Sequence, residues 1–329
     1  MRRVVVMGLA ALGSFALSCT LLVDLDGLQG TTPDAAVDAR SDATPDARGD
    51  ADADAATVDA APDAPPPPCD RTKPFDKPVA VSGLDGSGRE DLARFSPDLL
   101  TAYVLLRTPI NGITVELLQY ERATLGDAFT SVLNLGIPQS ALGTVMGLGH
   151  FGVSENELDL VYVDAVDKSA TECTRGLRTL PFGNCAKLSD PMASPFLAAD
   201  AGVLFGVGAG GGKPVGPAVA TRGATVWNPP VRMTELDIFG SPTTFSHPVA
   251  SVDQRTLFFA TVSPAPSPHV MVTTRAKSGD PFGAPVVVPE LEVNGTFTAP
   301  TWLSADQCTI FLVSDRIGTT DIFTAKRPK

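Results

Sequence analysis

One phrase occurs twice, far apart in the chain, and it constrains the fold more than any other feature. The early copy, over residues 73–81, reads Lys-Pro-Phe-Asp-Lys-Pro-Val-Ala-Val, and the late copy, over residues 280–288, reads Asp-Pro-Phe-Gly-Ala-Pro-Val-Val-Val. One complete repeat follows the late copy and ends at residues 321–327, close to the last residue. The first opening phrase has no repeat before it, and the last repeat has no opening phrase after it. This arrangement predicts a ring that is closed by its own first strand.

Three pieces recur in a fixed order between these copies, which makes an internal repeat the first hypothesis to test. The first piece is the opening phrase. The second is a turn of the type Ser-x-Asp followed by an apolar strand, and the third is a strand that ends in arginine. The turn positions are 58, 44, 53 and 53 residues apart, a spacing typical of propeller blades with four antiparallel strands; they are Asp98, Asn156, Asp200, Asp253 and Asp306. Such side chains accept hydrogen bonds from nearby backbone amides in turns, so we assign them a structural role.

The arginines of the third piece have two interpretations. They are Arg122, Arg178, Arg222, Arg275 and Arg327, of which Arg178 fits its repeat least well. A ring of arginines at one blade position would suit a ligand, whereas a residue that serves every repeat is more often part of the repeat itself. We therefore favour a structural role, with the turn aspartate of the same or the neighbouring blade as the partner.

The last repeat resembles a known family. Residues 299–306, with residues 311–318 and 321–323 after them, resemble the WD40-like repeat of TolB-type β-propellers, and residues 95–98 give a second clear match. The resemblance extends over residues 69–329 and implies an all-β propeller. TolB's own propeller has six blades, but five units are present here, so five blades are predicted, with six as the second alternative.

The first residues have the form of an export signal. A short positive segment, Met1–Arg3, precedes the apolar residues 4–17. The sequence Ala-Leu-Ser-Cys that ends at Cys19 resembles the lipobox of bacterial lipoproteins. The resemblance implies a signal peptide over residues 1–18, a lipid on Cys19 and a lipidated N-terminal segment over residues 19–30. Inner-membrane lipoproteins often have Asp after the lipidated cysteine, whereas this chain has Thr20. The resemblance therefore implies an outer-membrane location, on the periplasmic or cell-surface side. The alternative is an uncleaved membrane anchor, since the apolar run continues to Val23.

Residues 31–68 consist almost entirely of Asp, Ala, Pro and Thr. Nine aspartates and two arginines give this segment a charge of −7 out of the −12 of the whole chain. Its apolar content is too low to offset the entropy of ordering, so the segment is predicted to be a disordered, extended tether. The acidic balance argues against nucleic acid as a partner.

Four cysteines remain if Cys19 carries lipid, namely Cys69, Cys173, Cys185 and Cys308. An even number in an exported protein predicts two disulfides, with three possible pairings. The propeller closure implies one of them: Cys69 precedes the first opening phrase and Cys308 lies in the turn of the last blade, so a Cys69–Cys308 bridge would lock the ring and leave Cys173 to pair with Cys185. The sequence has no Cys-x-x-Cys pair and no histidine close to these cysteines, so a zinc site is not expected.

Sequence signals for chemistry are weak. Residues 206–211 match Gly-x-Gly-x-x-Gly formally, but a proline-containing loop follows where a dinucleotide site needs a helix. His150 and His247 each precede a turn segment and are interpreted as structural, and His269 stands alone. A nucleophile elbow is missing, and no dense calcium loop occurs, although Asp164 with Asp167, or Asp315 with Asp321, offers paired carboxylates. No cofactor and no metal are predicted.

The sequence thus favours a lipid-anchored, exported β-propeller that acts as a binding or scaffold module for protein or glycan partners. The alternative is a carbohydrate-active hydrolase that uses Asp or Glu in the central channel, because carboxylates are abundant and a pair of them suffices for glycoside hydrolysis. Catalysis is the less favoured interpretation, since a fold does not by itself imply an activity. The repeats leave the ligand contacts unassigned.

Overall fold

The computed structural model describes residues 69–84, 88–108, 114–137, 142, 150–164, 169–190, 192–208, 216–224, 226–237, 245–261 and 269–329. The predictions for the signal peptide, for Cys19, for residues 19–30 and for the tether of residues 31–68 lie outside these residues. All that follows concerns the propeller.

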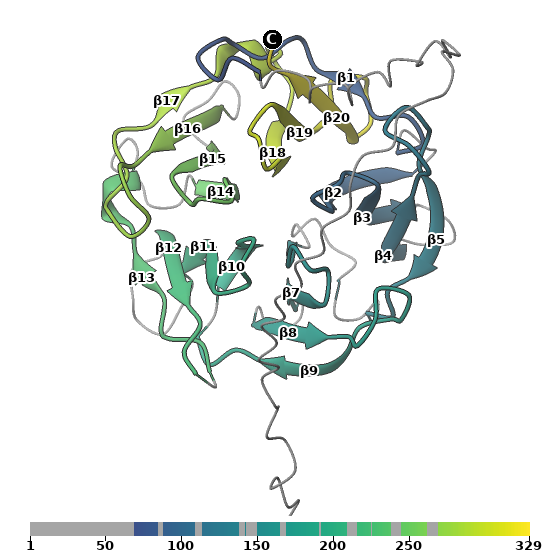
Figure 1. The fold of residues 1–329 in the computed structure, drawn as a ribbon, viewed down its shortest axis with the longest axis vertical. Coiled ribbons are helices and arrows are strands. Elements are labelled where there is room, and N and C mark those ends of the chain that lie inside the picture. The colour runs from purple at the N-terminus through teal and green to yellow at the C-terminus, as the bar shows by residue number, and fades with distance from the viewer. Residues whose placement is uncertain are drawn as a thin grey trace, which may run out of the picture. The chain divides into compact units, whose positions relative to one another are not determined.

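Five antiparallel sheets of four strands each are arranged around a centre, as Figure 1 shows, so the fold is an all-β propeller with five blades. The fold class is confirmed, and six blades are excluded. Blade 1 consists of β2 (Arg89–Phe95), β3 (Thr101–Thr108), β4 (Thr114–Glu121) and β5 (Thr130–Asn134). Blade 2 consists of β6 (Phe151–Val153), β7 (Asp159–Val163), β8 (Ala170–Thr174) and β9 (Gly183–Lys187).

The other three blades repeat this order from the centre outward. Blade 3 consists of β10 (Met192–Leu197), β11 (Val203–Gly208), β12 (Gly216–Thr221) and β13 (Val231–Arg232), followed by the 3-10 helix η1 (Thr234–Leu236). Blade 4 consists of β14 (Phe245–Ala250), β15 (Thr256–Thr261), β16 (Val270–Thr274) and β17 (Val286–Val287), followed by η4 (Pro289–Leu291). Blade 5 consists of β18 (Thr298–Leu303), β19 (Thr309–Ser314), β20 (Asp321–Lys326) and, from the start of the fold, β1 (Val79–Ala80).

The ring closes through the first opening phrase. Strand β1 pairs antiparallel with β20, with Val79 opposite Thr324 and Ala80 opposite Phe323. The amide of Val81 continues the ladder by donating to the carbonyl of Ile322 at 2.9 Å. In Figure 1 the blue β1 lies beside the yellow β20 near the C-terminus. The predicted pairing of the first segment with the last blade is confirmed.

Two disulfides are present. Cys69 is bonded to Cys308, which ties the start of the fold to the turn of blade 5, and Cys173 is bonded to Cys185, which links β8 to the neighbouring β9. This is the pairing that ring closure implies.

Apolar side chains fill the spaces between blades. The second strand of each blade is almost wholly buried, as in β15 and β19, because neighbouring blades cover both of its faces; these are the runs that the sequence marked as inner strands. Phe311 of blade 5 stacks on Phe95 of blade 1, with ring centroids 3.9 Å apart, so the closing contact between blades is aromatic. The glycine motif has a packing role where it is described: a Cβ on Gly206 in β11 would lie 2.6 Å from the Cγ atom of Met192.

Candidate functional site

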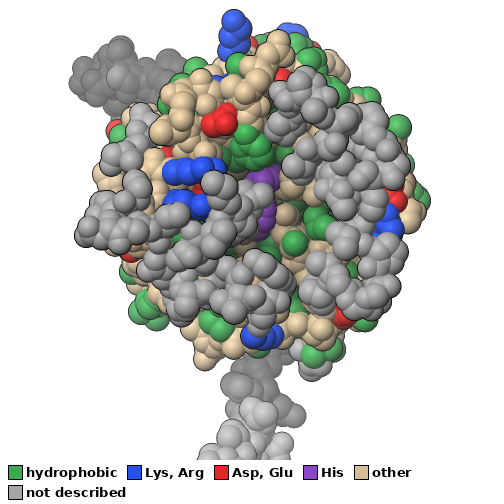
Figure 2. Space-filling view, turned by 180° about the vertical axis from the view of Figure 1, so that it is seen from behind, with side chains coloured by type: hydrophobic (Ala, Val, Ile, Leu, Met, Phe, Trp, Pro, Cys, Tyr) green, Lys and Arg blue, Asp and Glu red, His purple; other side chains and the backbone are tan. Residues whose placement is uncertain are grey.

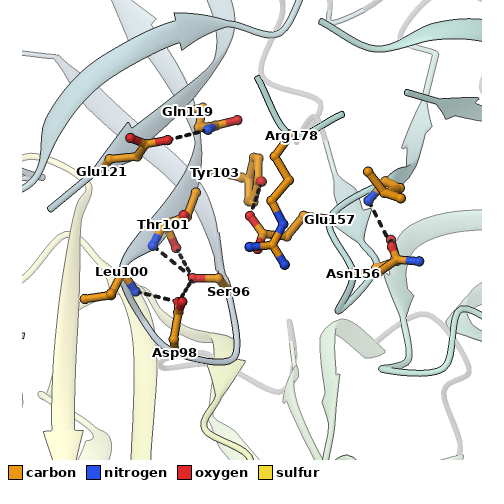
Figure 3. A network of polar contacts seen from close by, with 12 residues as sticks. Ser96, Asp98, Leu100, Thr101, Tyr103, Gln119, Glu121, Asn156, Glu157 and Arg178 are labelled. Atoms are coloured by element: carbon orange, nitrogen blue, oxygen red, sulfur yellow. Dashed lines mark hydrogen bonds and ion pairs between the residues drawn. The ribbon is translucent and has the colours of Figure 1, made fainter. Parts of the chain in front are cut away.

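The five repeated turns serve the fold. In blade 1 the hydroxyl of Ser96 donates to Oδ1 of Asp98 at 2.6 Å, and the same oxygen accepts the amide of Leu100 at 3.0 Å (Figure 3). These two hydrogen bonds lower the pKa of Asp98. The arrangement recurs at Asn156, Asp253 and Asp306, and Asp200 keeps only the bond from the amide of Gly202. The residue after each has a positive φ, which completes a tight turn; they are Leu99, Glu157, Ala201, Gln254 and Gln307.

The blade arginines are also structural, but their partners differ from the prediction. Each of four guanidinium groups donates from Nε to the carbonyl of the positive-φ residue, not to the carboxylate of the turn aspartate: Arg122 to Leu99, Arg175 to Glu157, Arg222 to Ala201 and Arg275 to Gln254. Each also lies over the aromatic ring of an opening phrase, at 4.0–4.8 Å from the centroid; the rings are Phe129, Phe182, Trp227, Phe282 and, under Arg327, Phe75. The arginine therefore joins the turn to the outer strand.

The assignment of Arg178 to this position was wrong, because Arg175 occupies it. Arg178 instead pairs with Glu157 at 3.1 Å and keeps a half-exposed side chain. A signal in the sequence distinguishes the two. Arg122 and Arg275 each precede their aromatic partner by seven residues, and Arg175 precedes Phe182 by seven.

A buried polar network fills the seam between blades 1 and 2, where "seam" means the space between adjacent blades on the side of the turns. The hydroxyl of Tyr103 donates to Glu157 at 2.5 Å (Figure 3). The same hydroxyl accepts from Arg175 at 2.6 Å, and Gln119 accepts from Arg175 at 3.0 Å. Burial and the bond to Glu157 raise the pKa of Tyr103, which stays neutral. All of these groups have protein partners, so the seam is a joint and not an open site.

Arg94 occupies the centre of the ring. Its side chain is fully buried and donates to the backbone carbonyls of three other blades: Phe151 of blade 2 at 3.1 Å, Pro195 of blade 3 at 3.4 Å, and Thr301 of blade 5. Burial lowers the pKa of Arg94 to about 9, so the guanidinium is charged at neutral pH. Sequence reasoning missed this residue, because an arginine two positions before the turn serine occurs in blade 1 alone.

His150 and His247 lie next to Arg94 and contact each other edge to face, with ring centroids 4.6 Å apart. Figure 2 shows histidine side chains at the bottom of a hollow in the centre of one face. Burial lowers the pKa of His247 to about 3, and the charge of Arg94 acts in the same direction. Burial, His247 and Arg94 together lower the pKa of His150 well below its usual value. Both rings are therefore neutral at physiological pH.

The two histidines predict a loss of stability in mild acid. A histidine whose pKa is lowered in the folded state takes up a proton on unfolding, so its contribution to stability is lost as the pH falls below the ordinary value of about 6.5. Each histidine should add roughly 1.4 kcal/mol of lost unfolding free energy per pH unit. Denaturant unfolding between pH 6.5 and pH 4.5 measures this slope, above the range in which Asp98 and Asp253 titrate.

The control for this prediction is the pair of single variants His150→Asn and His247→Asn. Asparagine tolerates the positive φ of 51° at position 247. Each variant should reduce the slope by about the contribution of one histidine. An identical slope in the wild type and in both variants would show that the pair does not titrate in this way.

Two adjacent carboxylates, Glu90 and Asp91, lie in the innermost strand of blade 1 and are both buried. Asp91 is held by Arg89 and by Arg107, each at 2.7 Å. The described residues of the other four innermost strands contain no Asp or Glu. Within the described residues, the other innermost strands therefore supply no carboxylate to complete a glycosidase pair. The buried Asp321 of blade 5 follows Thr320, whose carbonyl accepts the amide of Glu90 at 2.9 Å.

A cavity lies elsewhere, in the seam between blades 5 and 1. Its volume is about 570 Å³. Blade 1 contributes Asp98, Arg122 and Asp127, and blade 5 contributes Asp306, Phe311, Thr324 and Lys326 to the lining. This volume is in the range of small-molecule binding sites.

Metal binding receives no support from the described residues, among which no group of three or more His, Cys, Asp or Glu side chains is placed to hold an ion. Of the paired carboxylates considered for calcium, Asp315 accepts the amide of Phe297 at 2.7 Å and Asp321 accepts the hydroxyl of Thr319 at 2.7 Å, while Asp167 lies outside the described residues. No helix within the described ranges is long and apolar enough to span a bilayer.

Comparison with known proteins gives similarity at the level of fold. No family model and no curated protein matches the chain. The α-L-arabinofuranosidase PaAbf62A from Podospora anserina is 12% identical, with a TM-score of 0.48 over 78% of this chain and 96% of its own. A GH62 α-L-arabinofuranosidase from Coprinopsis cinerea is 10% identical, with a TM-score of 0.47 over 78% and 97%. TolB from Acinetobacter baumannii is 10% identical, with a TM-score of 0.36 over 78% of this chain and 55% of its own.

Proposed function

We propose that this chain is an exported binding module of the cell envelope, which presents its propeller to protein or glycan partners. The observation that carries the proposal is the state of the central channel. Arg94 is committed to three backbone carbonyls, Asp91 to two arginines, and the two histidines are neutral and buried. Groups that hold blades together are not free to exchange protons with a substrate, so recognition is favoured over catalysis.

The test uses the full chain purified from membranes. Immobilised protein is probed with a glycan array and with envelope extract, and bound partners are then titrated as purified components. Saturable binding that the Glu90→Gln variant retains supports a binding module. Failure to bind any glycan or envelope protein, together with a normal melting temperature, would overturn it.

A carbohydrate-active hydrolase is the second candidate, and the buried pair Glu90 and Asp91 is the observation in its favour. Two carboxyl groups are the side chains that glycoside hydrolysis requires. Turnover on a polysaccharide panel that Glu90→Gln abolishes would establish this function. Equal product formation by the wild type and the variant, or none by either, would exclude it for this pair.

The anchor belongs to the same proposal. The lipobox-like sequence that ends at Cys19 supports lipid attachment and an outer-membrane location, with residues 31–68 as the tether. The intact mass of the membrane fraction should show a diacylated or triacylated Cys19, and Cys19→Ala should release the protein from the membrane. Unmodified Cys19 in a membrane-bound chain would instead favour an uncleaved anchor.

A further inference from the structure

Two adjacent seams of the propeller differ at two positions, which decide whether the blade arginine has side-chain partners. Three residues before the blade arginine, blade 1 has Gln119 and blade 5 has Thr324. Seven residues after the turn serine, blade 1 has Tyr103 and blade 5 has Phe311. In the seam between blades 1 and 2, Gln119 and Tyr103 both reach Arg175.

The equivalent arginine in the seam between blades 5 and 1 lacks those partners. Arg122 donates from Nε to Leu99 and from one terminal nitrogen to Leu125. No side chain of blade 5 accepts from it within the described residues, because threonine is shorter than glutamine and phenylalanine has no hydroxyl. The buried Oγ1 atom of Thr324 likewise has no hydrogen-bond partner in the described part of the chain. Arg122, Thr324 and Phe311 all line the cavity of about 570 Å³.

Three carboxylates border this cavity, and each accepts hydrogen bonds from its own turn through only one of its two oxygens. Asp98 and Asp306 each use Oδ1, and Asp127 uses Oδ2 to accept the amide of Thr124 at 2.8 Å. The second oxygen of each makes no hydrogen bond to the residues that the structure describes. The Cys69–Cys308 bridge and the bond from Arg71 to the carbonyl of Asp306 at 3.1 Å fix the blade 5 side of the cavity.

We infer that this cavity binds a neutral, polyhydroxylated ligand of mono- to disaccharide size. Hydroxyl groups donate to carboxylates and accept from guanidinium and ammonium groups, so they satisfy Asp98, Asp127, Asp306, Arg122 and Lys326 together. An anion would meet three carboxylates, and a cation would leave the arginine and the lysine unpaired. The apolar ring edge of Phe311 and the side chain of Leu99 offer contact to the C–H face of a sugar.

The inference rests on the proposed binding function and assigns it a site. The probes are cellobiose, maltose and N,N′-diacetylchitobiose as neutral disaccharides, with glycylglycine as a zwitterion and inorganic phosphate as an anion. Each is titrated into the full chain by calorimetry. At least one disaccharide should bind saturably, and Asp127→Asn should weaken that binding about tenfold, the loss of one charge-assisted hydrogen bond.

Asp280→Asn is the matched control, because Asp280 accepts the amide of Lys277 in blade 4 as Asp127 accepts that of Thr124 in blade 1. It should leave the affinity unchanged. The double variant Thr324→Gln with Phe311→Tyr rebuilds the network of the filled seam inside the cavity. It should weaken binding, because the new side-chain acceptors compete with the ligand for Arg122, while the melting temperature stays at or above that of the wild type.

Disaccharide binding whose affinity the double variant leaves unchanged would overturn the inference. Binding of glycylglycine or phosphate in preference to every disaccharide would overturn it as well. Partner binding in the array experiment that is insensitive to the double variant would refute this site and leave the proposed function standing.

Discussion

Replacing Arg94 by methionine is expected to lower the free energy of unfolding by about 3 kcal/mol or more. Methionine has a similar length but donates no hydrogen bond, so the carbonyls of Phe151, Pro195 and Thr301 would stay buried without the donor that now joins them. The desolvation of the guanidinium works in the opposite direction, since its removal from water is unfavourable. We expect the orphaned carbonyls to dominate, because three are lost at once and each belongs to a different blade.

Guanidinium chloride unfolding, followed by tryptophan fluorescence, measures this effect. Arg89→Met on the same strand is the control: half of the Arg89 side chain is exposed, and Arg107 also holds its partner Asp91. The control should change stability by less than about 1 kcal/mol. If Arg94→Met were as stable as the wild type, the central clamp would contribute nothing net, and the channel would have to be held by apolar packing alone.

Removal of the Cys69–Cys308 disulfide is the second large effect. The bridge spans 239 residues, and the chain-entropy model assigns such a loop about 5.5 kcal/mol. The Cys69→Ala/Cys308→Ala variant should therefore lose more stability than Cys173→Ala/Cys185→Ala, whose loop of 12 residues is worth about 3 kcal/mol. Thermal unfolding of both double variants at equal protein concentration gives the comparison.

The decisive result is which of the two double variants has the lower melting temperature. In the Cys69/Cys308 variant, β1 should also detach from β20 more readily, since the bridge fixes the segment that completes blade 5. A Cys69/Cys308 variant that melts at or above the temperature of the Cys173/Cys185 variant would contradict a ring closed by this bond.

The repeat made the ring predictable, because the repeated residues have the same structural role in most blades. Asp98 and Asp306 accept amides in equivalent turns, and the phrase around Phe75 supplies the outer strand that the last blade lacks. The error at Arg178 arose from aligning the ends of strands, whereas the separation of seven residues between arginine and aromatic ring in blades 1 and 4 identifies Arg175.

The centre and the cavity were not predictable in this way, because they depend on departures from the repeat. Arg94 has no counterpart in the other blades, and its acceptors are backbone carbonyls, which leave no trace in the sequence. Arg122 in the cavity has only backbone acceptors, because Thr324 and Phe311 are smaller or less polar than Gln119 and Tyr103. Such a difference acquires meaning only when the structure shows which blade faces which arginine.

Amide hydrogen exchange at Val81 tests the ring closure most directly, since this amide donates to Ile322 of the last blade and has no other role. The measurement is made by NMR on the full chain under native conditions. If the first segment completes blade 5, Val81 exchanges as slowly as the amides in the middle of β20, with the free energy of global unfolding. Exchange of Val81 at the rate of an unpaired strand, while β20 stays protected, would contradict the closed ring.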